Sequence, residues 1–148
     1  MHSIYSDGAC ANAGMPNAIA TWGYVVMQGN NVTEAGTGRV IGIQDSNRAE
    51  LTAFIKALQY VRNQKGKMYV IYIDYEALFL YCNGKARPKK NLDLYKQINY
   101  LLEICKSRVR VEKVKAHKPN TAMSNFMNDV ADNLAKKSIA LLGAKNSY

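Results

Sequence analysis

Short runs of apolar residues, many of them β-branched or aromatic, recur along this chain and predict strands. Two of these runs end in an acid: Ile4 leads to Asp7, and Met68 leads to Asp74. A third run alternates valines with arginine and lysine, which predicts a strand with one wetter face. The tripeptide Gly29-Asn30-Asn31 is typical of a hairpin between the second and third strands. The predicted strands are residues 2–8, 19–28, 32–41, 67–74 and 108–115.

Apolar residues at helical spacing predict helices between and after these strands. The clearest lies on a stripe from Leu51 to Val61, where either Asp45 or Ser46 can cap the start of the helix. A second stripe runs from Leu92 to Leu102. The predicted helices are residues 46–63, 76–82, 92–105 and about 125–142. Loops are predicted over 9–18, 83–90 and 117 to about 125.

The order of these elements predicts an α/β fold. Three strands joined by short connections favour antiparallel pairing. The strands that follow helices are expected to run parallel to the first strand through right-handed crossovers. The prediction is a mixed five-stranded sheet, with the first three strands antiparallel, the rest parallel to strand 1, and helices on both faces. No internal repeat or second-domain boundary is visible, so residues 1–148 are interpreted as one domain.

Composition narrows the class of protein. Apolar residues make up 48% of the 148 residues, which is too many for a disordered chain. No apolar run approaches the length of a membrane span, and the start of the chain lacks the pattern of a signal peptide. The three cysteines are odd in number and have no paired metal-binding spacing, which favours reduced thiols in the cytoplasm. They are Cys10, Cys82 and Cys105.

The net charge is +9, from 20 basic and 11 acidic residues. One interpretation is a charge excess that only keeps the protein soluble. The other is a polyanionic partner, because clustered cations bind phosphates by releasing counterions. Because acids are few in this basic chain, acids that recur at the ends of predicted elements are candidates for a functional site.

Four carboxylates stand where an acid has little structural reason to be. Asp7 and Asp74 end apolar strands, Glu50 lies in the first turns of a helix, and Asp132 lies between Ala131 and Leu134. A carboxylate at a buried end of an element is costly unless it is paired or binds a metal. In α/β sheets, sites form beside strand ends, here those of the first and fourth strands. Four converging carboxylates suit Mg²⁺ or Mn²⁺.

Each carboxylate also has an ordinary structural interpretation. Glu50 could complement the helix dipole, Asp7 could be a turn residue, and Asp74 could cap the following helix. Asp132 could be a solvated helix acid, although its apolar neighbours argue against this. Together, the four form one pattern that these separate explanations do not predict.

Five segments give the chain a resemblance to type 1 ribonuclease H along nearly all its length. Each segment alone is weak, but all five in the family's order and spacing are specific. The segments are Tyr5-Ser6-Asp7-Gly8-Ala9-Cys10, Asn47-Arg48-Ala49-Glu50-Leu51, Tyr72-Ile73-Asp74, Val114-Lys115-Ala116-His117 and Asn128-Asp129-Val130-Ala131-Asp132-Asn133-Leu134-Ala135.

The resemblance implies an endoribonuclease that hydrolyses the RNA strand of RNA–DNA hybrids with two Mg²⁺ ions, for which Mn²⁺ would substitute. It implies that Asp7, Glu50, Asp74 and Asp132 hold the metals, with Asp7 bridging them. Asp129 lies on the same predicted helix, but the pattern of an acid followed by x-Leu-Ala selects Asp132. His117 is implied as a mobile imidazole that assists proton transfer or product release.

Recognition of a hybrid requires contacts to 2′-hydroxyl groups and to phosphates. The candidates for the 2′-hydroxyl contacts are Asn12, Ser46, Asn47 and Glu76, with Asn47 favoured because it lies one helical turn from Glu50. The candidates for the phosphate contacts are Lys89, Lys90 and Asn91. Any of these could equally be an ordinary solvated residue.

The chain departs from the family's larger bacterial members, which carry an extra helix and a basic handle after the fourth strand. The interval from Asp74 to Asn91 is too short for that handle. Only the stretch Lys85-Ala86-Arg87-Pro88-Lys89-Lys90 remains. The segment from His117 to Asp132 is longer than the family pattern predicts.

Two other functions are weighed against hybrid cleavage. A related nuclease acting on DNA, such as a resolvase or transposase core, usually brings extra domains for which this chain has no length. A non-catalytic hybrid-binding module is expected to lose a carboxylate, and none of the four is missing. The expected partner is therefore an RNA–DNA hybrid, with no membrane and no obligate protein partner.

Overall fold

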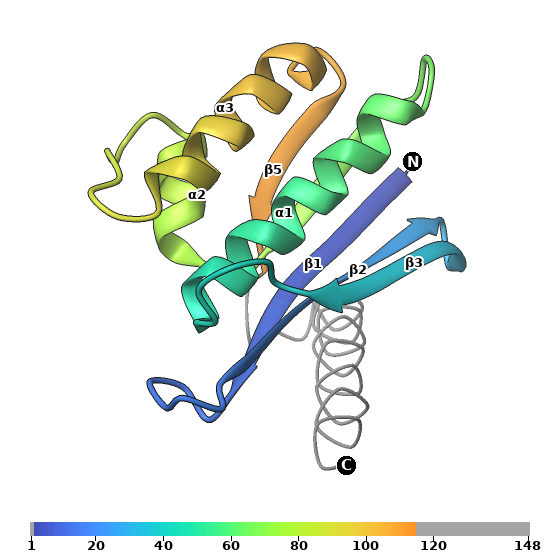
Figure 1. Cartoon of the computed structure of the whole chain (residues 1–148). Helices are drawn as coiled ribbons and strands as arrows, with labels where there is room; N and C mark the ends of the chain where they lie inside the picture. The colour runs from blue at the N-terminus through green and yellow to red at the C-terminus, as the bar shows by residue number, and fades with distance from the viewer. Residues whose placement is uncertain (1, 115–148) are drawn as a thin grey trace.

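The protein folds around a mixed five-stranded sheet with helices packed against it (Figure 1). The structure, a computed structural model, describes residues 2–114. The strands lie in the order β3-β2-β1-β4-β5. The elements are β1 (His2–Ala11), β2 (Ile19–Gln28), β3 (Asn31–Arg39), α1 (Ser46–Asn63), β4 (Tyr69–Ile73), α2 (Glu76–Cys82), α3 (Leu92–Cys105) and β5 (Val109–Lys113).

The pairing of the strands confirms the predicted topology. β1 pairs antiparallel with β2, and β2 pairs antiparallel with β3. β4 runs parallel to β1, and β5 runs parallel to β4. The two parallel strands each follow a helical segment, because a parallel neighbour can be reached only by crossing over the sheet.

The first strand is longer than its apolar run predicts. β1 continues to Ala11, which pairs with Ile19, so the prediction of a loop from residue 9 was wrong. Asp7 is therefore an interior residue of β1, and neither a strand end nor a turn residue. The error arose because pairing with β2 extends the strand through residues that carry little local strand pattern. β3 is shorter than predicted and ends at Arg39.

All three described helices contribute to one hydrophobic core against one face of the sheet. Phe54 of α1, Leu78 of α2 and Ile98 of α3 are buried in the same cluster as Ile4 and Ile71 of the sheet. The predicted bounds of α1, α2 and α3 agree with the structure. The helix predicted over 125–142, on which the expectation of helices on both faces depends, lies outside the described residues.

The N-terminus of α1 is capped by Asp45, whose Oδ1 accepts a hydrogen bond from the Arg48 N–H at 2.7 Å. This settles the choice that the sequence left open between Asp45 and Ser46. Among the described residues, no helix combines the length and the apolar character that crossing a membrane requires.

Candidate active site

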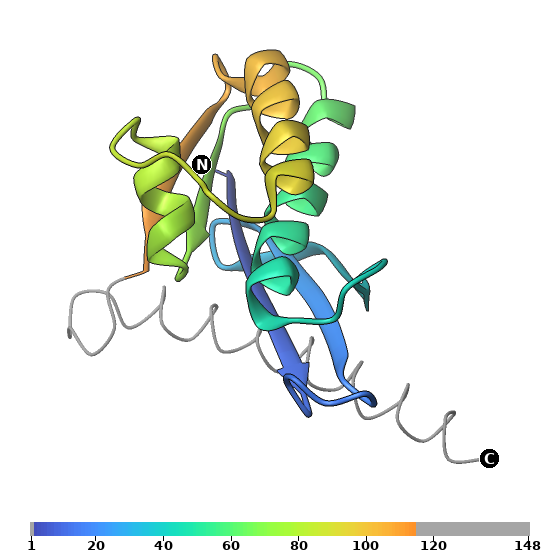
Figure 2. The same cartoon turned by 60° about the vertical axis from the view of Figure 1, so that its left-hand side comes forward.

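β1 and β4 separate at the place where the predicted carboxylates lie. Their parallel pairing runs as far as Tyr5 and Tyr72. Two residues further along each strand stand Asp7 and Asp74, and there β1 continues with β2 alone. Figure 2 shows the first turns of α1 lying over this part of β1. We call this point, where β1 no longer pairs with β4 and an acid follows on each side, the carboxylate opening.

Gly8 allows α1 to approach this opening. A Cβ atom at Gly8 would overlap the backbone of Ala49 and Glu50. The backbone of β1 therefore lies directly against the backbone of α1, which only glycine permits. This contact brings Glu50 within hydrogen-bonding distance of Asp7.

Asp7 and Glu50 form a pair of carboxyl groups in a mostly buried position. Asp7 is 7% exposed, and its Oδ1 accepts a hydrogen bond from the Gly8 N–H at 2.9 Å. Burial, together with the hydrogen bond and negative charge of Asp7, raises the pKa of Glu50 to about 10. The charge of Asp74 acts in the same direction, and the backbone of Gly8 opposes it. Without a cation, the pair therefore shares a proton at neutral pH.

Asp74 stands directly after β4 and is more exposed than Asp7. Partial burial raises its pKa, while the ammonium group of Lys113 opposes that shift. Lys113 ends β5, and its Nζ lies 3.6 Å from Oε2 of Glu76, the first residue of α2. Asp74 is not capping α2, because Tyr75 holds that position without a side-chain hydrogen bond. Asp74 therefore lies beside a Lys113–Glu76 ion pair at the rim of the opening.

The described carboxylates fit a divalent cation by their chemistry. Asp7 and Glu50 offer hard oxygen donors that repel one another unless a proton or a cation intervenes. Within residues 2–114, however, no group of three metal-binding side chains is close enough to hold an ion. The remaining predicted members, Asp132 and His117, lie outside the described residues.

The predicted substrate contacts lie on several segments of the described chain. Ser46 and Asn47 are the exposed first residues of α1. Asn12 is exposed in the turn after β1, with a left-handed φ of 55°. Lys89 and Lys90 are exposed in the segment that precedes α3. The substrate contacts proposed for these five residues stay predictions.

Asn91, the third predicted phosphate contact, is partly exposed. It precedes α3 with a φ of 57°, and its Oδ1 accepts a hydrogen bond from Arg48 Nη1 at 3.2 Å. Glu76 is likewise engaged, in the ion pair with Lys113.

Arg48 is a buried cation near the site that the sequence interpretation did not single out. Its Nη1 and Nη2 donate to the two carboxylate oxygens of Asp93 at 2.9 and 2.7 Å. This pairing raises the pKa of Arg48 and lowers the pKa of Asp93 to about 2. The sequence held a clue, because Arg48 shares the apolar face of α1 with Leu51 and Ile55 and a charge there needs a partner.

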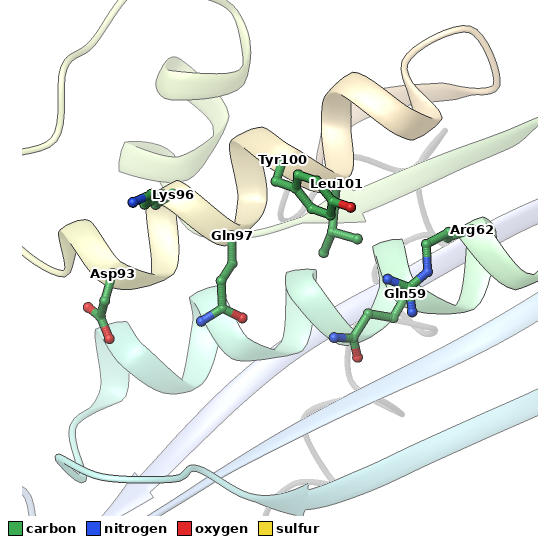
Figure 3. A pocket seen from close by; sticks show the side chains of 7 residues that line it. All are labelled: Gln59, Arg62, Asp93, Lys96, Gln97, Tyr100 and Leu101. Atoms are coloured by element: carbon green, nitrogen blue, oxygen red, sulfur yellow. The ribbon is translucent and has the colours of Figure 1, made fainter.

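A pocket of about 420 Å³ lies elsewhere, between α1 and α3 (Figure 3). It contains none of the predicted site residues, so it is separate from the carboxylate opening. Its lining residues are Gln59, Arg62, Asp93, Lys96, Gln97, Tyr100 and Leu101.

Comparisons with known proteins agree with the geometry. The sequence model of the RNase H family matches residues 1–140. The chain is 32% identical to a ribonuclease H of Syntrophomonas wolfei, over 95% of this chain and 97% of that protein. The fold resembles LC11-RNase H1, isolated from compost, with a TM-score of 0.76 and 20% identity over 95% and 96% of the two chains. It also resembles LC11-RNase H1 in complex with an RNA/DNA hybrid, with a TM-score of 0.64 and 18% identity over 90% and 99% of the chains.

Proposed function

Because the chain belongs to the RNase H family, we propose that it is an endoribonuclease that hydrolyses the RNA strand of RNA–DNA hybrids by two-metal-ion catalysis. The observation that carries the proposal is the contact between Asp7 and Glu50 at the opening between β1 and β4. A buried pair of carboxyl groups costs stability in a fold that does not use it. Its presence in a chain of net charge +9 supports the proposal of a cation between carboxylates and phosphate.

The four carboxylates are proposed to hold Mg²⁺, or Mn²⁺ in its place, with Asp7 shared between two ions. When bound, the ions would activate a water molecule and stabilise the leaving oxygen of the phosphodiester. Asp132 is proposed to complete the ion on the water side, and Glu50 and Asp74 to complete the other. Glu50 must lose its proton on loading, so protonation and metal binding compete at this residue.

His117 is proposed to carry protons to or from the reacting groups without binding metal. Its place in the sequence, shortly after the last predicted strand, supports this role. Proton-transfer groups of this kind contribute to turnover, and the metals provide the larger effect.

The proposed substrate is a hybrid because one solved relative of this fold, LC11-RNase H1, is described in complex with an RNA/DNA hybrid. Ser46 and Asn47, at the exposed start of α1, are proposed to contact 2′-hydroxyl groups. Lys89 and Lys90 are proposed to contact backbone phosphates from the segment that Arg48 ties to α1 through Asn91.

One assay tests the proposal against its alternatives. A labelled RNA–DNA hybrid is incubated with the protein beside double-stranded RNA and double-stranded DNA of the same sequence, with Mg²⁺ or with EDTA. Cleavage of only the RNA strand of the hybrid, and only with Mg²⁺, is the expected result. Cleavage of DNA would indicate a related DNA nuclease, and binding of the hybrid without cleavage would indicate a non-catalytic module.

A further inference from the structure

The last residue of β5, Lys113, continues a row of side chains that faces the hydrophobic core. Val109 and Val111 pack against the core that the helices form with the sheet. Because side chains alternate along a strand, Lys113 lies on the same face of β5 as these two valines. The Lys113 side chain is 35% exposed, so most of its surface is covered. The strand therefore carries a partly covered cation to its end, where the apolar row stops.

Strand pairing places Lys113 beside the carboxylate opening. Lys113 is the partner of Ile73 in the parallel pairing of β4 with β5. The Val114 N–H donates to the Ile73 carbonyl oxygen at 2.8 Å, so the two strands stay together up to the residue before Asp74. Burial raises the pKa of Asp74, and the charge of Lys113 opposes that shift. Lys113 therefore lies at the side of the opening that Asp74 occupies.

The ion pair that Lys113 forms with Glu76 is a loose one. Its Nζ lies 3.6 Å from Oε2 of Glu76, whereas a charge-assisted hydrogen bond is about 2.7–2.9 Å long. Glu76 is 69% exposed, and an ion pair with an exposed carboxylate adds little stability. An ammonium group has three donor hydrogens, so it can bind a second anion. Lys113 is therefore available to a stronger anion at the opening.

We propose that Lys113 positions the substrate by contacting a backbone phosphate of the hybrid at the carboxylate opening, and that Glu76 holds the ammonium beside the opening in the free protein. A lysine ammonium binds phosphate as a compact point charge and needs no fixed direction of approach. A cation here also offsets the negative charge that carboxylates and phosphate bring together. The inference rests on the proposed function, because it adds a residue to the binding of that substrate.

The test compares the parent protein with Lys113→Gln, which removes the charge, and with Lys113→Arg, which keeps it. The matched control is Arg110→Gln, which removes one cation from the same strand and breaks its ion pair with Glu112 at 3.0 Å. Affinity for a labelled RNA–DNA hybrid is measured by fluorescence anisotropy in EDTA at several salt concentrations. KM and kcat are then measured with Mg²⁺, and circular dichroism checks that each variant is folded.

Lys113→Gln is expected to weaken the affinity for hybrid about five- to tenfold near 0.1 M salt, with a matching rise in KM and little change in kcat. The slope of log affinity against log salt should fall by roughly 0.9, the value for one phosphate contact. Lys113→Arg should recover most of the loss, because the charge is kept. Arg110→Gln should behave as the parent does.

The variant Glu76→Gln separates a phosphate contact from a purely structural role of Lys113. If Lys113 only oriented Glu76, Lys113→Gln would cost no further affinity in a protein that already carries Glu76→Gln. A direct phosphate contact predicts that the cost in that background is as large as in the parent. The proposal is overturned by unchanged affinity and KM in folded Lys113→Gln, or by a loss that disappears in the Glu76→Gln background. A fall in kcat without a rise in KM would also overturn it.

Failure of this inference is distinguishable from failure of the proposed function. A parent that cleaves hybrid, with a Lys113→Gln variant of equal affinity and KM, keeps the function and loses the inference. A parent that binds hybrid but does not cleave it loses the proposed hydrolysis, and the affinities in EDTA still decide whether Lys113 contacts the substrate.

Discussion

At the scale of single residues, the chain places a protonated glutamate against an aspartate inside its fold. Burial and the charge of Asp7 hold the proton on Glu50. The arrangement is stable without a cation only because that proton removes one of two repelling charges. Two consequences can be measured, one at Asp7 and one at Glu50.

Replacing Asp7 with Asn should abolish cleavage of hybrid and leave the fold intact. An amide removes the negative charge with which the bridging residue would hold both ions, while its size and its contact with Glu50 remain similar. The melting temperature in EDTA should stay equal or rise, because a repelling charge is lost. Circular dichroism and the hybrid assay measure both effects. Near-normal hydrolysis by a folded Asp7→Asn protein would remove Asp7 from the site.

The stability of the metal-free protein should fall as pH rises. The folded-state pKa of Glu50 is about 10, above its ordinary value of 4.5, so the folded state keeps a proton that the unfolded chain releases. This contribution to stability is complete below about pH 4.5 and is lost as pH rises toward 10. Glu50→Gln, which cannot ionise, should therefore melt higher than the parent in EDTA at pH 9, and the gap should narrow at pH 5.

Scanning calorimetry of the parent and Glu50→Gln from pH 5 to pH 9 measures that gap. Added Mg²⁺ should raise the melting temperature of the parent more at high pH than at low pH, because protons and metal compete for Glu50. Two melting curves that stay parallel across the whole range would show that Glu50 ionises normally.

At the scale of elements, α1 and α3 are joined at their starts by a paired charge. Arg48 is largely buried, with a side chain 10% exposed, whereas its partner Asp93 is 60% exposed. The pair also fixes Asn91, and through it the segment that carries Lys89 and Lys90. The local geometry of the proposed phosphate contacts thus depends on a residue that touches no phosphate.

Asp93→Ala should lower the free energy of unfolding by about 1–2 kcal/mol. Removing one partner of a buried pair usually costs more, but the exposure of Asp93 lets solvent screen part of the charge. Denaturant unfolding measures the change. Glu103→Ala is the matched control, because it breaks an exposed pair with Lys106 and should cost less than about 0.5 kcal/mol. Equal costs for the two substitutions would mean that the Arg48–Asp93 pair adds no more than a surface pair.

At the scale of the whole molecule, a chain of net charge +9 contains a buried pair of acids, Asp7 and Glu50. In the proposed function, the basic side chains attract the phosphate backbone of the substrate. The carboxylates would hold the metal ions that act on one phosphate. The segment from Lys85 to Lys90 carries part of this positive charge and directly precedes Asn91 and α3 in the chain.

Changing Lys85, Lys89 and Lys90 together to Gln should raise KM for the hybrid and flatten its salt dependence. Each phosphate contact removed lowers the slope of log affinity against log salt by roughly 0.9. The control changes Lys65, Lys67 and Lys106, which follow the opposite ends of α1 and α3 and give the same loss of charge. If both triple variants show the same KM and slope, the segment before α3 contributes only general charge.

The sequence by itself determined the order and the type of every described element. The bounds of α1, α2 and α3 followed from apolar spacing, because a helix repeats its pattern within a few residues of the same segment. The family motifs pointed to the four acids in the same way, since each motif is local, and their role as metal ligands stays a prediction. Those features require no knowledge of what lies across the fold.

The tertiary structure decided everything that depends on a distant partner. β1 extends to Ala11 because β2 pairs with it there, and Arg48 tolerates burial because Asp93 meets it from 45 residues away. The raised pKa of Glu50 arises only where Gly8 lets α1 touch β1. Strand pairing, burial and electrostatic coupling are interactions between segments that are distant in the sequence. A local sequence pattern does not specify which distant segments will be in contact.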